Sequence, residues 1–127
     1  MRRINCSKDT EEIFRIIWSD QMELREEFYM LALNRANKVL GWYRISEGGT
    51  SSTVVDAKLV SSIALNCNAS AIVLAHNHPS GNLKPSQADK DLTRQLKDGG
   101  KLLEISDIDH LILTAESYLS FADEAWM

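Results

Sequence analysis

Apolar residues recur along this chain with two different periods, and these periods predict where its helices and strands lie. In three segments the apolar residues are spaced three and four apart, as on the buried side of an amphipathic helix. The predicted helices run from Asp9 to Trp18, from an N-cap at Asp56 to Cys67, and from Ser86 to the pair Gly99-Gly100. The polar segment 19–27 could continue the first of them as a second short helix.

Shorter apolar runs, bounded by turn residues, predict the strands. The run 71–75 is continuously apolar, which is typical of a central strand covered on both faces. Two earlier runs flank a polar turn and predict an antiparallel hairpin. The predicted strands are 28–33, 39–45, 71–75, 108–114 and 117–121, with a turn at 47–50 and a further strand at 51–55. Because helices and strands interleave, we expect an α/β fold with a mixed β-sheet flanked by helices.

The length and composition of the chain are consistent with these predicted elements. A chain of 127 residues with 44% hydrophobic and 25% charged residues is typical of one globular domain, here 1–127 with a helical lead-in over 1–25. Cys6 and Cys67 lie far apart and form no CxxC, which predicts two reduced thiols. No apolar run approaches the roughly 18 residues of a membrane span, and no signal peptide is visible. We therefore expect a cytoplasmic protein.

The net charge of −4 opposes general binding to phosphate backbones, which depends on lysine and arginine. One local exception lies on the third predicted helix, where four cations share a face: Lys90, Arg94, Lys97 and Lys101. Two interpretations stand beside each other, a solvated helix face and a basic patch for nucleic acid.

The candidate chemistry lies in the segment that follows the central strand. His76 and His78 are two apart in an extended segment, so their imidazoles point the same way. Pro79 favours the extended conformation of His78, and Asp89 falls in the first turn of the next helix, close to the loop it leaves. Ser86 and Asp89 also form a helix-capping pattern, which is compatible with a role in the site. Two imidazoles and a carboxylate suit Zn²⁺ and leave a fourth position open.

A zinc hydrolase also needs a group that takes and returns a proton. Four glutamates are candidates, and spacing does not choose among them: Glu23, Glu26, Glu27 and Glu47. His110, before the apolar run 111–113, has three possible roles: a partner of the metal ligands, a structural residue or a metal ligand itself.

The pattern His76-x-His78-x₇-Ser86-x-x-Asp89 matches the JAMM motif of MPN metallopeptidase domains. The sequence around this motif, including Asp109-His110, resembles the bacterial RadC family over roughly residues 26–127. The resemblance implies the MPN fold, similar in architecture to cytidine deaminase. It also implies His76, His78 and Asp89 as zinc ligands, Ser86 as oxyanion stabiliser and Glu26 as the base.

The expected function is therefore that of a zinc-dependent metallohydrolase, a peptidase or isopeptidase that cleaves an amide bond in a peptide or protein. Two alternatives remain beside it. One is a DNA-associated repair or recombination protein or nuclease, and the other is a non-catalytic MPN interaction scaffold. The longer RadC proteins carry a helix-hairpin-helix module that this chain is too short to include, which weakens the DNA role. A deaminase is excluded, because the His-x-Glu and Pro-Cys-x-x-Cys patterns of that chemistry are missing. The oligomeric state is left open.

Overall fold

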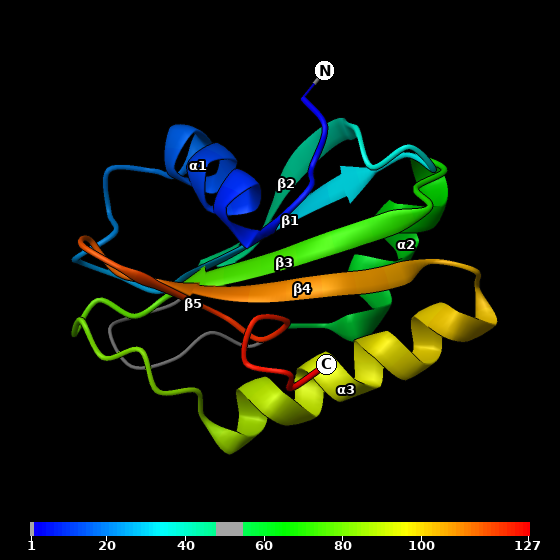
Figure 1. The fold of residues 1–127 in the computed structure, drawn as a ribbon. Coiled ribbons are helices and arrows are strands. Elements are labelled where there is room, and N and C mark those ends of the chain that lie inside the picture. Colours follow the sequence, from blue (N-terminus) through cyan, green and yellow to red (C-terminus); the bar gives the residue numbers. More distant parts are fainter. Residues whose placement is uncertain (1, 48–54) are drawn as a thin grey trace.

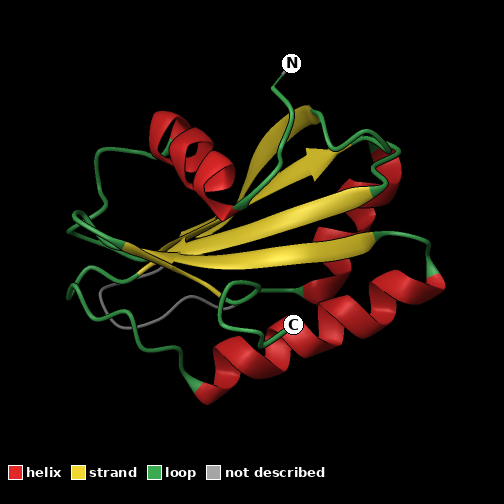
Figure 2. Cartoon of the chain, in the orientation of Figure 1, coloured by secondary structure: helices red, strands yellow, loops and turns green. Residues whose placement is uncertain are grey.

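The computed structural model describes residues 2–47 and 55–127, which form an α/β domain (Figures 1 and 2). The elements follow in the order α1 (Ser7–Ile17), β1 (Glu27–Leu33), β2 (Val39–Glu47), α2 (Ala57–Asn66), β3 (Ala71–Asn77), α3 (Gln87–Leu102), β4 (Ser106–Leu113) and β5 (Tyr118–Ser120). Within these described residues the strands form one mixed sheet in the order β2-β1-β3-β4-β5, in which only β3 and β4 are parallel. The predicted mixed sheet flanked by helices is confirmed.

Helices cover both faces of the sheet, so the central strands carry apolar side chains on both sides. Figure 1 shows α1 on one face and α2 with α3 on the other. Each face has its own core, one around Phe14 and Leu31 under α1, the other around Met30 and Leu96 under α2 and α3. Every residue of β1 and β3 is buried. This burial on both faces explains the continuous apolar run that predicted the central strand.

The topology brings three separate segments to one edge of the sheet. β3 ends there, and the loop after it leads into α3. β1 runs antiparallel to β3 with Phe28 paired to His76, so β1 begins where β3 ends. Continuing this register by two residues places Glu26 opposite His78.

Two predicted boundaries were wrong. Residues 20–24 form turns rather than a second short helix, and the chain then enters β1 directly. The third helix does not end at Gly99-Gly100 but continues to Leu102. Gly100 instead allows the chain at Ile105 to fold back closely over the helix end. A Cβ on Gly100 would lie 2.3 Å from the carbonyl oxygen of Ile105. The left-handed residue that terminates the helix is Glu104, with φ of 58°.

The predicted turn at 47–50 and strand at 51–55 fall largely on residues 48–54, outside the described part of the chain. Within the described part, no helix has the length and apolar character needed to cross a membrane.

Candidate metal centre

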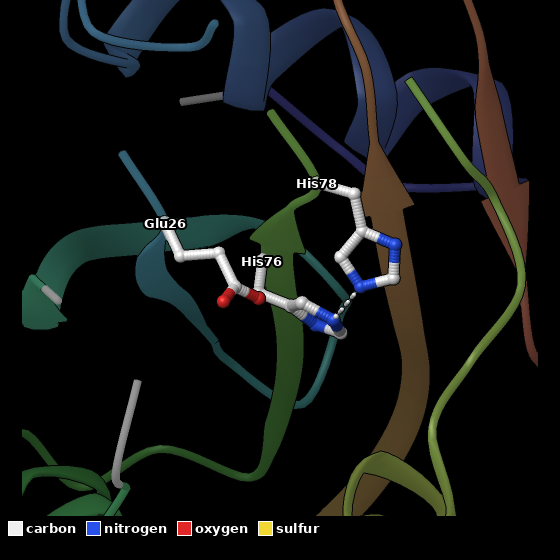
Figure 3. Close-up of side chains that lie close together, drawn as sticks. All are labelled: Glu26, His76 and His78. Carbon is white, nitrogen blue, oxygen red and sulfur yellow. Dashed lines mark hydrogen bonds between the residues drawn. The ribbon is translucent and has the colours of Figure 1, made fainter. Parts of the chain in front are cut away.

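His76 and His78 point to the same side at the end of β3. Their Nε2 atoms lie 3.0 Å apart, and His76 is buried while His78 is partly exposed. Figure 3 shows the Glu26 side chain directed toward both rings from the start of β1. The Nδ1 atom of His78 lies 2.6 Å from the carbonyl oxygen of Asn82. Because a carbonyl only accepts, this Nδ1 carries the proton, and a neutral His78 presents a bare Nε2 to the site.

Asp89 reaches the same point from the first turn of α3. Its Oδ2 lies 3.3 Å from Nε2 of His76 and 3.8 Å from Nε2 of His78. The carboxylate is held by a capping box, in which it accepts from the Ser86 N–H while the Ser86 hydroxyl accepts from the Asp89 N–H. The Ser86 hydroxyl therefore keeps its own hydrogen for another acceptor.

The structure separates the four candidate glutamates. The Glu26 carboxylate lies within 4.8 Å of a ring nitrogen of both His76 and His78, and this group of three could hold a metal ion. Glu27 faces the other side of the sheet, where it accepts from Ser19 and lies 3.6 Å from the guanidinium of Arg44. Glu23 is exposed, and the side chain of Glu47 lies outside the described residues.

Asn77 binds the backbone on both sides of Glu26, a role that the sequence did not reveal. Its side chain points away from the imidazoles, as the alternation of an extended segment predicts. There the amide donates to the carbonyls of Met22 and Arg25 and accepts from the N–H of Glu27. These three bonds pin the segment before β1 to the end of β3. A buried amide between the two histidines was the available signal.

The protonation states of the site suit cation binding. Burial alone would raise the pKa of the Asp89 carboxyl, but the neighbouring His76 ring and hydrogen bonding to Ser86 outweigh burial and hold that pKa well below its usual range. Burial lowers the pKa of His78, although the Asn82 carbonyl opposes the shift. Burial raises the pKa of Glu26. Near neutral pH the site thus offers an anionic Asp89 and a neutral His78, the forms that bind metals.

Behind His76 lies a second buried imidazole, that of His110 on β4. Its Nε2 is 2.8 Å from Nδ1 of His76, and its own Nδ1 is 2.6 Å from the hydroxyl oxygen of Thr93 on α3. Phe121 stacks on the ring and Phe28 meets it edge-on, so His110 is fully buried and its pKa lies well below the ordinary value. His110 is therefore a partner of His76 rather than a direct neighbour of Asp89 or His78.

Three of the four cations of α3, Lys90, Arg94 and Lys101, are exposed, and Lys97 is partly buried. Together with Thr93, Asp98, Phe121, Trp126 and Met127, they line one cavity between α3 and the last residues of the chain. The ammonium of Lys90 lies 5.3 Å from the centre of the Trp126 ring.

A mixed sheet flanked by helices, with paired imidazoles at the end of its central strand, defines a JAB/MPN-type domain. A model of the RadC-like JAB domain family matches residues 4–126. The chain therefore belongs to this family, as its motif implied.

Several relatives share the sequence over most of this chain. It is 43% identical over 124 residues to a UPF0758 protein of Flavobacterium johnsoniae, covering 98% of this chain and 53% of the relative. A UPF0758 protein of Porphyromonas gingivalis is 43% identical over 126 residues, covering 98% of this chain and 56% of the relative. UPF0758 protein YfjY of Escherichia coli is 46% identical over 99 residues, covering 78% of this chain and 62% of the relative. The chain thus spans about half the length of the first two relatives.

Proposed function

We propose that this domain is a zinc-dependent hydrolase of the JAMM type that cleaves an amide bond in a peptide or protein. The observation that carries the proposal is the convergence of three metal-binding atoms. Nε2 of His76, Nε2 of His78 and Oδ2 of Asp89 are separated by 3.0, 3.3 and 3.8 Å. A tetrahedral zinc ion with bonds of about 2.0–2.1 Å holds its ligand atoms about 3.3–3.4 Å apart. The three side chains therefore fit zinc with little rearrangement.

Two residues supply the remaining chemistry. When bound, zinc supplies a Lewis acid that polarises the substrate carbonyl and lowers the pKa of water to about 7. In this proposal Glu26 takes the proton of the attacking water and returns it to the leaving amine. The Ser86 hydroxyl, which keeps its own hydrogen, donates to the carbonyl oxygen as that oxygen gains negative charge. Hydrogen bonds support both residues: Asn77 binds the backbone on either side of Glu26, and the Ser86 hydroxyl accepts from the Asp89 N–H.

The zinc content of purified protein tests the site. We expect wild type to hold one zinc ion and to be stabilised by added zinc, by about 2.7 kcal/mol at a hundredfold excess over the dissociation constant. His76→Ala and Asp89→Ala should lose both properties. Lys58→Ala, an exposed residue on α2, is a control that should behave as wild type. Equal and negligible zinc in wild type and both site variants would contradict the proposal. Zinc binding without hydrolysis of any peptide would favour the alternative of a non-catalytic interaction scaffold.

One observation favours a second candidate function, association with nucleic acid. The cavity lined by Lys90, Arg94, Lys97 and Lys101 gathers positive charge in a protein whose net charge is −4. Binding of a short oligonucleotide should then weaken steeply with salt, and each removed phosphate contact should lower the slope by about one. Arg94→Ala with Lys97→Ala tests this against the exposed pair Lys38→Ala with Lys58→Ala. Equal slopes for both pairs would remove the support.

A further inference from the structure

Whether His76 can bind a cation depends on which of its nitrogens carries the proton. Its Nε2 faces His78 and Asp89, and its Nδ1 faces His110. A neutral imidazole has one N–H and one bare nitrogen. If the proton sits on Nε2, His76 donates to Asp89 or His78 and its lone pair is turned away from the site. If it sits on Nδ1, the lone pair is available to a metal.

A backbone carbonyl on α3 determines which nitrogen of His76 carries the proton. The Thr93 hydroxyl lies 2.8 Å from the carbonyl oxygen of Asp89, one turn earlier. Because a carbonyl has no hydrogen to donate, the hydroxyl hydrogen of Thr93 must point toward it. The lone pairs of the Thr93 oxygen are then left for Nδ1 of His110, at 2.6 Å. Nδ1 of His110 is therefore the donor in that hydrogen bond.

The same reasoning assigns the proton between the two nitrogens of the His110 ring. This ring is fully buried between Phe28 and Phe121, where a charged imidazolium is costly. A neutral His110 that donates from Nδ1 has a bare Nε2. That atom lies 2.8 Å from Nδ1 of His76 and accepts its hydrogen. His76 then presents a bare Nε2 to the site.

We propose that Thr93 and His110 form a hydrogen-bond relay that holds His76 in its metal-binding tautomer; this inference rests on the proposed zinc site and deepens it. Both are positioning residues, since neither contributes one of the three proposed metal-binding atoms. With the Nδ1 of His78 bound to Asn82, two bare nitrogens and one carboxylate oxygen face one another with no hydrogen between them. A bound cation satisfies all three. The relay starts at the carbonyl of Asp89 and ends at His76, so it also ties two proposed ligands together.

The tautomers of the metal-free wild-type chain give the first test, and this test needs neither zinc nor a substrate. Long-range proton–nitrogen correlation spectra at neutral pH distinguish protonated from bare ring nitrogens. We expect the proton on Nδ1 in His76, His78 and His110. A proton on Nε2 of His76 in the folded wild type would overturn the relay.

Zinc affinity of Thr93 variants, measured by competition with a chelator, gives the second test. Thr93→Val keeps the shape of the buried side chain and removes the hydroxyl, so the proton on Nδ1 of His110 loses its acceptor. We expect zinc affinity to fall by about 10–100-fold, as for other residues that orient metal ligands. In the metal-free variant we also expect the proton to leave Nδ1 of His76. Thr93→Ser keeps the hydroxyl and should restore affinity to within about threefold of wild type.

Thr10→Val is the matched control for these variants. Thr10 is likewise buried on a helix and donates to a backbone carbonyl, that of Ser7 at 2.6 Å, but it lies on α1. Its substitution should leave zinc affinity unchanged. Wild-type affinity in Thr93→Val, or equal losses in Thr93→Val and Thr93→Ser, would overturn the relay and leave the hydrolase proposal standing. Wild type that binds no zinc would overturn the hydrolase proposal, and the spectra would still decide the relay.

Discussion

At the scale of single residues, the Glu26 carboxylate lies beside two imidazoles in a largely buried position. Burial raises its pKa, which makes it a better proton acceptor near neutral pH than an exposed glutamate. Glu26→Gln keeps the shape of the side chain and removes its basicity. We therefore expect hydrolysis of quenched-fluorescent peptides to slow by roughly 10²–10⁴-fold, while metal analysis finds zinc content unchanged.

The pH dependence of the wild type follows from the same shift. Because the Glu26 pKa is raised, this carboxylate takes up a proton at a higher pH than an ordinary glutamate does. The acid limb of kcat/KM should therefore lie above pH 4.3, roughly the ordinary value for a glutamate. Glu23→Gln, at an exposed position, should change neither rate nor zinc content. Loss of zinc in Glu26→Gln would instead make Glu26 a ligand, as its distance of at most 4.8 Å from His76 and His78 allows.

The proposed metal ligands could be brought together from the sequence alone more readily than the proposed base. His76 and His78 lie on one extended segment, so local alternation alone places them on one side. Glu26 and Glu27 are neighbours that face opposite sides of the sheet. The choice between them depends on the pairing of β1 with β3, which starts at Phe28 and His76. Spacing carries no information on that register, and only the family resemblance favoured Glu26.

At the scale of elements, α3 combines three tasks along its length. Its first turn presents Asp89 through the capping box, and its second turn places Thr93 against His110. Its last turn lets the chain fold back toward β4, where the Ile105 N–H donates to the Gly100 carbonyl at 2.8 Å. The position of Asp89 relative to His76 therefore depends on how the whole helix sits on the sheet.

The two glycines near the end of α3 should respond oppositely to alanine. A Cβ on Gly100 would lie 2.3 Å from the Ile105 carbonyl oxygen, so Gly100→Ala must displace the backbone. We expect it to lower the free energy of unfolding by about 1–3 kcal/mol. A Cβ on Gly99 meets nothing within 4 Å, so Gly99→Ala should raise stability by about 0.5–1 kcal/mol through helix propensity.

Urea unfolding of both variants measures the difference, with zinc affinity as a second readout. Equal effects of the two substitutions would show that Ile105 does not pack against Gly100 in solution. The sequence predicted a helix end at this glycine pair because glycine often follows a helix. It could not show that Gly100 is needed for close approach to Ile105, because that contact forms only after the chain has turned back at Glu104.

At the scale of the whole molecule, the sheet brings together residues that the sequence keeps apart. His110 meets His76 because β4 pairs in parallel with β3, so that His110 lies beside Leu74 and on the same face as His76. The interleaved pattern of apolar segments was enough to predict the fold class. It did not reveal that pairing, because one register shift separates Ile72 from Val73 and sets the face of every later residue on β4.

The same face of β4 buries Asp107, which has no evident part in the site. Neither carboxylate oxygen accepts a hydrogen bond from any described residue. Burial, together with the nearby Asp109, raises the pKa of Asp107 well above its usual value, although Lys97 opposes this. The folded chain therefore holds a proton there that the unfolded chain releases above about pH 4. The stability contributed by this group falls as pH rises from that value through the raised pKa.

Asp107→Asn should remove this pH-dependent penalty. We expect the variant to exceed wild type in free energy of unfolding by about 1–2 kcal/mol at pH 8 and to differ little at pH 4, measured by urea unfolding at both values. Asp109→Asn is the matched comparison, because Asp109 is also buried but accepts from Ser120, Ala122 and the N–H of His110. An amide has only one acceptor oxygen, so that variant should lose about 1–2 kcal/mol at both pH values. A gain for Asp107→Asn of equal size at pH 4 and pH 8 would mean that the carboxylate is not protonated in the folded chain.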